Sequence, residues 1–187
     1  MGEILAGKVK TQNFSEKELK ETIPAFRELT KQAGDDFVPQ LTELCAMRGV
    51  ALVIVPHLPG TYAHGATKWL HPGKAMLQLS TRYQYADIFW FSLFHELGHI
   101  LLHSKKNTFI ETGEKTDEEA EADRFASECL IPGTKYRNFV AKNRVTRESI
   151  KKFANEISID PGIVVGRLHH DGKIARGDFK DLQRKLV

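Results

Sequence analysis

The sequence predicts an α+β fold, in which helices surround a small sheet of mostly antiparallel strands. Two observations indicate the strands. Val50–Val55 is a continuous apolar run, β-branched at four of six positions, and residues 75–80 alternate in hydrophobicity. A third observation indicates helices, because apolar residues recur at intervals of three and four through much of the remaining chain. With 187 residues, the chain is long enough for one domain with a substantial core.

Residues 14–48 have the periodicity of helices, with a break at Gly34 and an end at Gly49. We expect these helices to cover the sheet and to carry no chemistry. We interpret residues 1–40 as an N-terminal helical segment, a remnant of or a linker to another domain, ahead of a domain of residues 41–187. Between the strands, Pro and Gly residues predict a loop, a short strand at 66–70 and then a turn.

The most informative stretch is residues 88–103, IFWFSLFHELGHILLH, which contains an H-E-x-x-H pattern. Residues four apart share one face of a helix, so His95 and His99 would offer two imidazoles to one ion. Glu96, rotated off that face, would reach a water bound to the metal, as in zinc peptidases. The alternative is a buried helix that carries two histidines by chance. A buried carboxylate is costly, however, and Gly98 costs roughly 1 kcal/mol relative to alanine, unless another segment or a substrate must come close.

A catalytic zinc site usually has three protein ligands and a fourth position for water. His103 shares the histidine face but lies about 12 Å along the helix from His95, too far to bind the same ion. We interpret it as a polar helix end that interacts with the C-terminal dipole.

The third ligand is therefore expected in residues 116–132, TDEEAEADRFASECLIP, which predict a second helix. We predict Glu119 as the ligand, with Asp123 one turn on to accept the other N–H of a ligand histidine. Neighbouring helix positions differ by about 100° in direction, so Glu118 and Glu121 point elsewhere. We interpret these two as solvated acids near a helix N-terminus.

The C-terminal part predicts short helices, one with its N-cap at Thr146 and another at residues 163–169. Two helices joined by a short turn, with Arg167 exposed, also resemble a DNA-reading motif, although this spacing suits any helical hairpin. Residues 134–187 carry a net charge of +7, which would attract nucleic acid, although a solvated surface is the commoner reason for such an excess.

Composition is that of a soluble globular protein, with 41% hydrophobic and 27% charged residues. No apolar run approaches the ~20 residues of a membrane helix, and no signal peptide is indicated, so we expect no membrane partner. Cys45 and Cys129 lie in apolar contexts without a CxxC motif, and we interpret them as reduced core residues of a cytoplasmic protein.

The stretches FWFSLFHELGHILLH and EEAEADRFASECLIP resemble the ImmA/IrrE family of zinc metallopeptidases. That family resembles the thermolysin group, whose third ligand is a Glu followed four residues later by Asp or Asn, as are Glu119 and Asp123. GATKWL, LQLSTRY and PGIVVGRLHHDG are similar to a branch in which this domain follows a DNA-binding helix-turn-helix, often described beside HigA-type antitoxins. The resemblance runs from about residue 41 to the C-terminus and implies a zincin-like fold and a Zn²⁺ cofactor.

The resemblance implies a zinc-dependent endopeptidase that cleaves a bacterial transcriptional repressor or antitoxin under stress. Glu96 would act as the general base. One alternative is a regulatory or antitoxin-type binding module with a non-catalytic metal site. Another is a DNA-binding regulator that uses residues 146–170. Four side chains are candidates to stabilise the oxyanion: Tyr62, His64, Tyr136 and His169.

We expect residues 75–80 to form an exposed edge strand next to the cleft, because one face of the strand is more polar than the other. Such an edge binds an extended peptide by strand addition, as in the resembled peptidases. The predicted substrate-binding residues are Ala75, Met76, Leu77, Gln78, Leu79 and Ser80.

Overall fold

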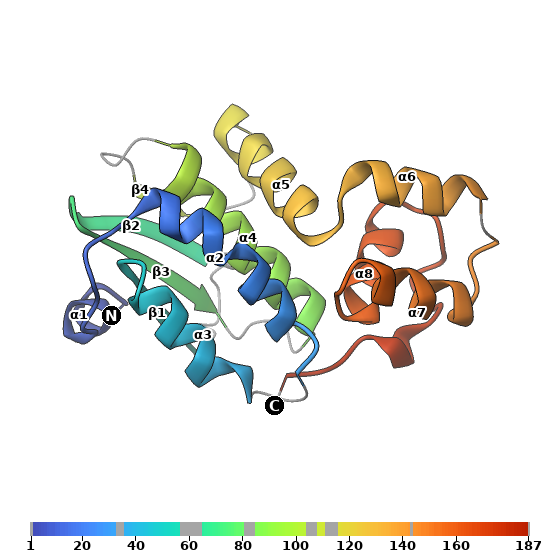
Figure 1. The fold of residues 1–187 in the computed structure, drawn as a ribbon, viewed down its shortest axis with the longest axis horizontal. Helices are drawn as coiled ribbons and strands as arrows, with labels where there is room; N and C mark the ends of the chain where they lie inside the picture. Colours follow the sequence, from blue (N-terminus) through green and yellow to red (C-terminus); the bar gives the residue numbers. More distant parts are fainter. Residues whose placement is uncertain are drawn as a thin grey trace.

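A computed structural model describes residues 2–32, 36–56, 65–80, 85–103, 108–110, 116–142 and 144–186. The fold is α+β, as predicted, with helices around a mixed sheet (Figure 1). The described part of the sheet has four strands in the order β1-β3-β2-β4. Their bounds are Val50–Val55 for β1, Gly65–His71 for β2, Lys74–Ser80 for β3 and Thr108–Ile110 for β4.

Two of the three strand pairings are antiparallel, which confirms the expected mostly antiparallel sheet. β2 pairs antiparallel with both β3 and β4. β2 and β3 form a hairpin whose turn at Pro72 and Gly73 was predicted. β1 and β3, the two strands most apparent in the sequence, pair in parallel. The short β4 was not predicted from the sequence, and the residues on either side of it lie outside the described part of the chain.

The expectation that residues 75–80 form an exposed edge is wrong. β3 lies between β1 and β2, and its backbone is paired on both sides from Ala75 to Leu79. The alternation itself was interpreted correctly, since Leu77 belongs to one hydrophobic cluster and Met76 to another on the opposite face. Alternation reports the two faces of a strand and contains no information about its edges. Strand addition to β3 is therefore not available to a substrate.

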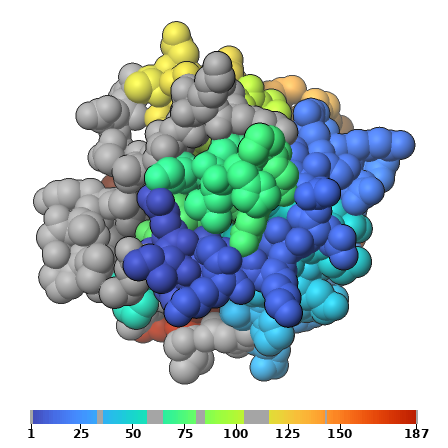
Figure 2. All heavy atoms as spheres, turned by 90° about the vertical axis from the view of Figure 1, so that its left-hand side faces the viewer, coloured from blue at the N-terminus to red at the C-terminus, as the bar shows by residue number. Residues whose placement is uncertain are grey.

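Different helices pack on the two faces of the sheet. The main core holds Leu52, Leu77 and Leu79 against helices α2 (Glu16–Leu29), α3 (Phe37–Ala46) and α4 (Ala86–Leu102). The other face carries a small cluster around Val53 and Met76, which α1 (Gly2–Lys8) closes with Ala6. Figure 2 shows α1 in dark blue against the green strands.

Helices α2 and α3 are part of the main core. Leu19 and Phe26 of α2 are fully buried beside Leu41 of α3. Arg27 ties α2 to the C-terminal half by donating to the carbonyl oxygens of Cys129 and Ile157. The domain boundary expected between residues 40 and 41 falls inside α3, so α2 and α3 act as cover for one core.

The remaining helices follow α4 in the chain, and the first and last of them pack against it (Figure 1). They are α5 (Asp117–Leu130), α6 (Gly133–Lys142), α7 (Arg147–Glu156) and α8 (Pro161–His170), followed by a 3₁₀ turn at Lys180–Leu182. The predicted N-cap is confirmed, because Thr146 accepts a hydrogen bond from the backbone N–H of Ser149. α8 packs between α7 and α4.

Cys45 and Cys129 are both free, and Cys45 is buried in the core, as expected. Burial raises the pKa of Cys45 to about 12 and that of Cys129 to about 11, so both thiols are protonated at neutral pH. In the part of the chain that the structure describes, no helix has the length and apolar character required to span a bilayer.

α4 and α5 pack closely at Gly98, which confirms that another segment must approach this glycine. A Cβ atom on Gly98 would lie 3.1 Å from the Cα of Ala122 and 3.2 Å from the ring of Phe125. Ala122 and Ala126 supply the small side chains on the α5 side, and both are fully buried. The glycine therefore sets the distance between the two helices.

We predict that Gly98→Leu destabilises the protein by about 1–3 kcal/mol in urea unfolding, because the larger side chain overpacks the contact between α4 and α5. Gly7→Leu is the matched control, since Gly7 is also helical and a Cβ there meets nothing within 4 Å. Leucine is a better helix former than glycine, so the control should be neutral or slightly stabilised. Equal effects at the two positions would contradict the close-contact explanation.

Candidate metal centre

The H-E-x-x-H segment lies on the most buried helix of the described fold. α4 contacts β2 and β3 on one side, α5 on another, and α8 as well. His95 is 2% exposed, Glu96 0% and His99 1%. This burial follows from the apolar sequence on all sides of α4, which only an interior helix has.

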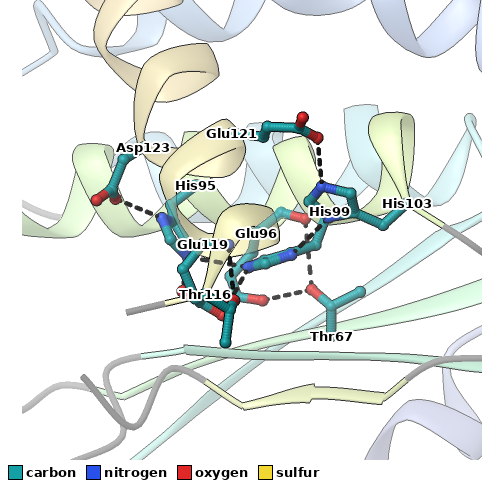
Figure 3. A network of polar contacts seen from close by, with 9 residues as sticks. All are labelled: Thr67, His95, Glu96, His99, His103, Thr116, Glu119, Glu121 and Asp123. Atoms are coloured by element: carbon teal, nitrogen blue, oxygen red, sulfur yellow. Dashed lines mark hydrogen bonds and ion pairs between the residues drawn. The ribbon is translucent and has the colours of Figure 1, made fainter. Parts of the chain in front are cut away.

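His95, His99 and Glu119 converge at one point, where their ligand atoms lie within 4.8 Å of one another (Figure 3). The Nε2 atoms of the two histidines are 3.0 Å apart. The Glu119 carboxylate lies 3.0 Å from Nε2 of His95 and 3.3 Å from Nε2 of His99. The structure thus brings together the three residues predicted as metal ligands.

Glu119 owes its position to the start of α5. Thr116 is the N-cap, and its hydroxyl accepts a hydrogen bond from the backbone N–H of Glu119 at 3.2 Å. Glu119 is half-buried, and burial raises the pKa of its carboxyl, while the neighbouring His95 partly opposes this rise. A carboxylate held against imidazoles in this way is suited to bind a cation.

Asp123 lies where the sequence predicts it, one turn beyond Glu119. Its Oδ1 is 2.9 Å from Nδ1 of His95. A carboxylate only accepts hydrogen bonds, so Nδ1 of His95 donates the proton. Nε2 of His95 is then an acceptor, and it points toward the convergence point.

His103 lies at the end of α4, as predicted, but its side chain also has two partners that were not predicted. Its side chain is 5% exposed, and its Nδ1 lies 2.9 Å from Nδ1 of His99. On the other side of its ring, Nε2 lies 3.3 Å from Oε2 of Glu121. Glu121 is exposed near the start of α5, as expected of a solvated acid, but it also contacts His103. This contact could not be read from the sequence, because His103 and Glu121 meet only when α5 lies beside α4.

The donor set at the convergence point fits a metal cation. Glu121 accepts a hydrogen bond from the Nε2–H of His103, which leaves Nδ1 of His103 to accept one from the Nδ1–H of His99. Nε2 of His99, like that of His95, is then an acceptor that faces the Glu119 carboxylate. Burial and the neighbouring histidines lower the pKa of His99 to about 3, so its ring is neutral, as a metal ligand must be. Two lone pairs and a carboxylate repel one another unless a cation lies between them.

Glu96, about 100° around α4 from His95, contacts strand β2 of the sheet. Thr67 of β2 donates to Oε2 of Glu96 at 2.5 Å. Gly65 on the same strand allows the carboxylate its place, since a Cβ there would lie 2.3 Å from Oε1 of Glu96. Sequence reasoning missed both residues. A threonine and a glycine in a short strand carry no local signal, and their role arises only where β2 passes beside α4.

A pocket of about 310 Å³ opens beside His95, between α4, α5 and α8. Its walls are mostly apolar, with Phe91, Leu130 and Ile163 among them. Asp123 also lines it, so the pocket adjoins the metal-ligating cluster.

Tyr136 and His169, the two oxyanion candidates within the described residues, have partners away from the cluster. Tyr62 and His64 lie outside the described residues. Tyr136 is buried on α6 beneath the guanidinium of Arg167, and Nε2 of His169 bonds to the carbonyl oxygen of Asp178 at 2.9 Å.

The expected exposure of Arg167 as a DNA-reading side chain is not found. Its side chain is 30% exposed, donates to Asp171 at 2.8 Å and lines the apolar pocket. Five consecutive or neighbouring residues of α8 are buried between α4 and α7: Gly162, Ile163, Val164, Val165 and Leu168. The burial of α8 between two helices, and the engagement of Arg167 by Asp171, favour a packing role for α8 over a DNA-reading one.

Two buried imidazoles and a carboxylate that converge beside a buried glutamate define a metallopeptidase-type site. The family described as the IrrE N-terminal-like domain, peptidase family M78, matches residues 54–169, which is more than half of the chain. The chain therefore belongs to this family, which is the ImmA/IrrE resemblance seen in the sequence. Comparison with curated proteins gives no significant match.

We predict that removal of Glu119, by Glu119→Ala, causes the largest loss of zinc affinity among the α5 acids, because a ligand is lost outright. Asp123→Ala should lose less, by the ~10–100-fold typical of a partner that orients a ligand. Glu118→Ala is the control, as an exposed acid beside the site, and should bind zinc like wild type. Competition titration against a chromophoric chelator measures all three. A zinc-deficient Glu118→Ala would overturn the ligand assignment.

We predict that Thr67→Val destabilises the fold by about 1–3 kcal/mol, because the buried carboxylate of Glu96 loses a hydrogen-bond donor in exchange for a methyl group. Thr67→Ser keeps the hydroxyl and should lose less. Urea unfolding of the metal-free proteins provides the comparison. If valine is tolerated better than serine, the hydroxyl has no part in holding Glu96.

Proposed function

We propose that this protein is a zinc-dependent endopeptidase in which His95, His99 and Glu119 hold the metal and Glu96 is the general base. The observation that carries the proposal is that His95, His99 and Glu119 converge beside α4, the helix that also carries the buried carboxylate of Glu96. Two imidazoles and one carboxylate are the ligand set of catalytic zinc sites that keep a fourth position for water. Zinc bound there would polarise the substrate carbonyl and lower the pKa of its water from about 15.7 to about 7.

Glu96 has the features required of the base. It follows His95 directly, so its carboxylate leaves the helix about 100° away from the ligand face and flanks the site without occupying it. The Thr67 hydroxyl holds one of its oxygens. In the reaction, Glu96 takes the proton of the attacking water and then delivers it to the amine that leaves. The fixed carboxylate needs little reorganisation for either transfer.

The surroundings of the site support a peptide substrate. The pocket between α4, α5 and α8 would accept a substrate side chain, and Asp123, which contacts His95, lies in its wall. The resemblance to the branch found with HigA-type antitoxins supports a transcriptional repressor or antitoxin as the substrate class. A stress-response role and a cytoplasmic location accompany that substrate class, and both remain predictions.

The two alternatives have less support. A binding module with a non-catalytic metal site would not need a general base, yet a buried carboxylate is kept beside the ligands at a cost in desolvation. A DNA-binding regulator that uses residues 146–170 is disfavoured by the burial of α8. We therefore retain the binding module as the runner-up and expect no direct DNA contact from α8.

We predict that Glu96→Gln retains zinc and loses cleavage by at least ~10²–10⁴-fold, because glutamine keeps the shape of glutamate but cannot accept the proton. The assay incubates zinc-loaded wild type and variant with the transcriptional regulators encoded beside the gene and follows cleavage by mass spectrometry. Near wild-type cleavage by the variant contradicts the mechanism. A wild type that holds zinc but cleaves no regulator favours the binding module.

A further inference from the structure

We propose that His103 is a positioning residue for the metal centre: it fixes the tautomer and the ring orientation of His99, and Glu121 in turn fixes His103. This inference rests on the metal site of the proposed function but not on the reaction at that site. Asp123 and His103 then have parallel tasks, since one orients His95 and the other orients His99.

The three histidines form a column along α4. Ring centroids are 4.8 Å apart between His95 and His99 and 5.0 Å apart between His99 and His103. In this column, His99 presents Nε2 to His95 and Glu119 and presents Nδ1 to His103. The nitrogen of His99 that does not face the cluster is thus engaged by a neighbouring side chain, as is typical of metal-ligating histidines.

The end of α4 explains why His103 turns back onto His99. His103 is the C-cap residue, with φ −111° and ψ 166°, so the helix stops there and the backbone becomes extended. Its backbone N–H still bonds to the carbonyl oxygen of His99 at 3.2 Å. Backbone and side chain of His103 therefore both bind the same residue, one turn earlier. A side chain that served only the helix dipole would point to solvent, whereas this one is 5% exposed.

Glu121 decides the direction of the hydrogen bonds. A carboxylate accepts from Nε2 of His103, and a neutral imidazole with its proton on Nε2 has an acceptor at Nδ1. Nδ1 of His99 is then the donor, which leaves Nε2 of His99 as a lone pair for the metal. The opposite tautomer of His99 would place a proton where the ion binds.

The hydrogen bond between His99 and His103 is expected to be stronger than the one between His103 and Glu121. The link between His99 and His103 is buried, with side chains 1% and 5% exposed. The link between His103 and Glu121 is longer, at 3.3 Å, and the Glu121 side chain is 50% exposed, so water competes for it. We therefore expect the loss of His103 to matter more than the loss of Glu121. Glu121 and Glu119 lie on the same turn of α5, so the outer link also helps to hold the third ligand beside α4.

The first experiment measures zinc affinity of metal-free protein by competition with a chromophoric chelator. His103→Leu should lower zinc affinity by ~10–100-fold, as the loss of an orienting partner does. His103→Asn should restore part of it, because an amide oxygen can stand in for Nδ1 as the acceptor. Glu121→Leu should lower zinc affinity by a smaller factor, within ~10-fold. Glu121→Gln should lower it still less, since the glutamine oxygen can accept the hydrogen bond from His103. Glu118→Leu, the control on the same helix, should match wild type.

The second experiment reads the tautomer directly, by ¹⁵N NMR of the histidine rings in the metal-free protein. We expect His99 protonated at Nδ1 in wild type and a mixture of tautomers in His103→Leu. A wild-type His99 protonated at Nε2 overturns the proposal, as does zinc affinity of His103→Leu and His103→Asn within twofold of wild type. If His103→Leu fails to fold, the proposal is tested by the His99 tautomer in wild type and by the zinc affinities of Glu121→Leu and Glu121→Gln.

Failure of this inference is distinguishable from failure of the proposed function. If zinc affinity depends on His103 as expected but the protein cleaves nothing, the positioning role stands and the peptidase function is refuted. If the wild-type protein cleaves a regulator and His103→Leu binds zinc as tightly as wild type, the peptidase function stands and the positioning role is refuted.

Discussion

The close contact between α4 and α5 is the constraint on which the rest of the structure depends. α4 supplies two imidazoles and a buried carboxylate, but a three-ligand metal site needs a third group from another element, and α5 must come close to provide it. The absence of a side chain at Gly98 and the small side chains of Ala122 and Ala126 allow this approach. Once the helices are in contact, Glu119 reaches the histidine pair, and Asp123 reaches the far side of His95. The glycine thus weakens α4 locally and makes the site geometrically possible.

Polar groups inside this fold are arranged around α4 in two directions. Toward α5, the ring nitrogens of the histidines meet carboxylates, and the resulting chain of donors and acceptors leaves only acceptors at the centre. Toward the sheet, the Glu96 carboxylate meets the Thr67 hydroxyl and the open backbone at Gly65. This separation gives the ligands and the base different environments on one helix. Glu96 and Thr67 are 0% and 1% exposed, so water does not compete for the hydrogen bond between them, which is stronger than at a surface.

The sequence predicted the parts of this site that depend on local periodicity. The spacing of His95 and His99 is one helical turn, and the angular argument for Glu119 over Glu118 needed only the direction of side chains on α5. Features that depend on how elements meet were not predictable in the same way. Residues 75–80 were placed at an edge because alternation shows two faces, whereas the position of β3 between two neighbours is set by pairing. The contact between His103 and Glu121 was not predicted, because the two residues are distant in sequence. The role of Thr67 was not predicted either, because its partner Glu96 is on another element.

The most direct test of the account is a crystal structure of the zinc-loaded protein, with anomalous data collected at the zinc absorption edge. The account predicts one strong anomalous peak, bonded to Nε2 of His95, Nε2 of His99 and the carboxylate of Glu119, with Nδ1 of the two histidines still bonded to Asp123 and His103. A peak ligated through His103 or Glu121, or the absence of a peak at the junction of α4 and α5, would contradict it.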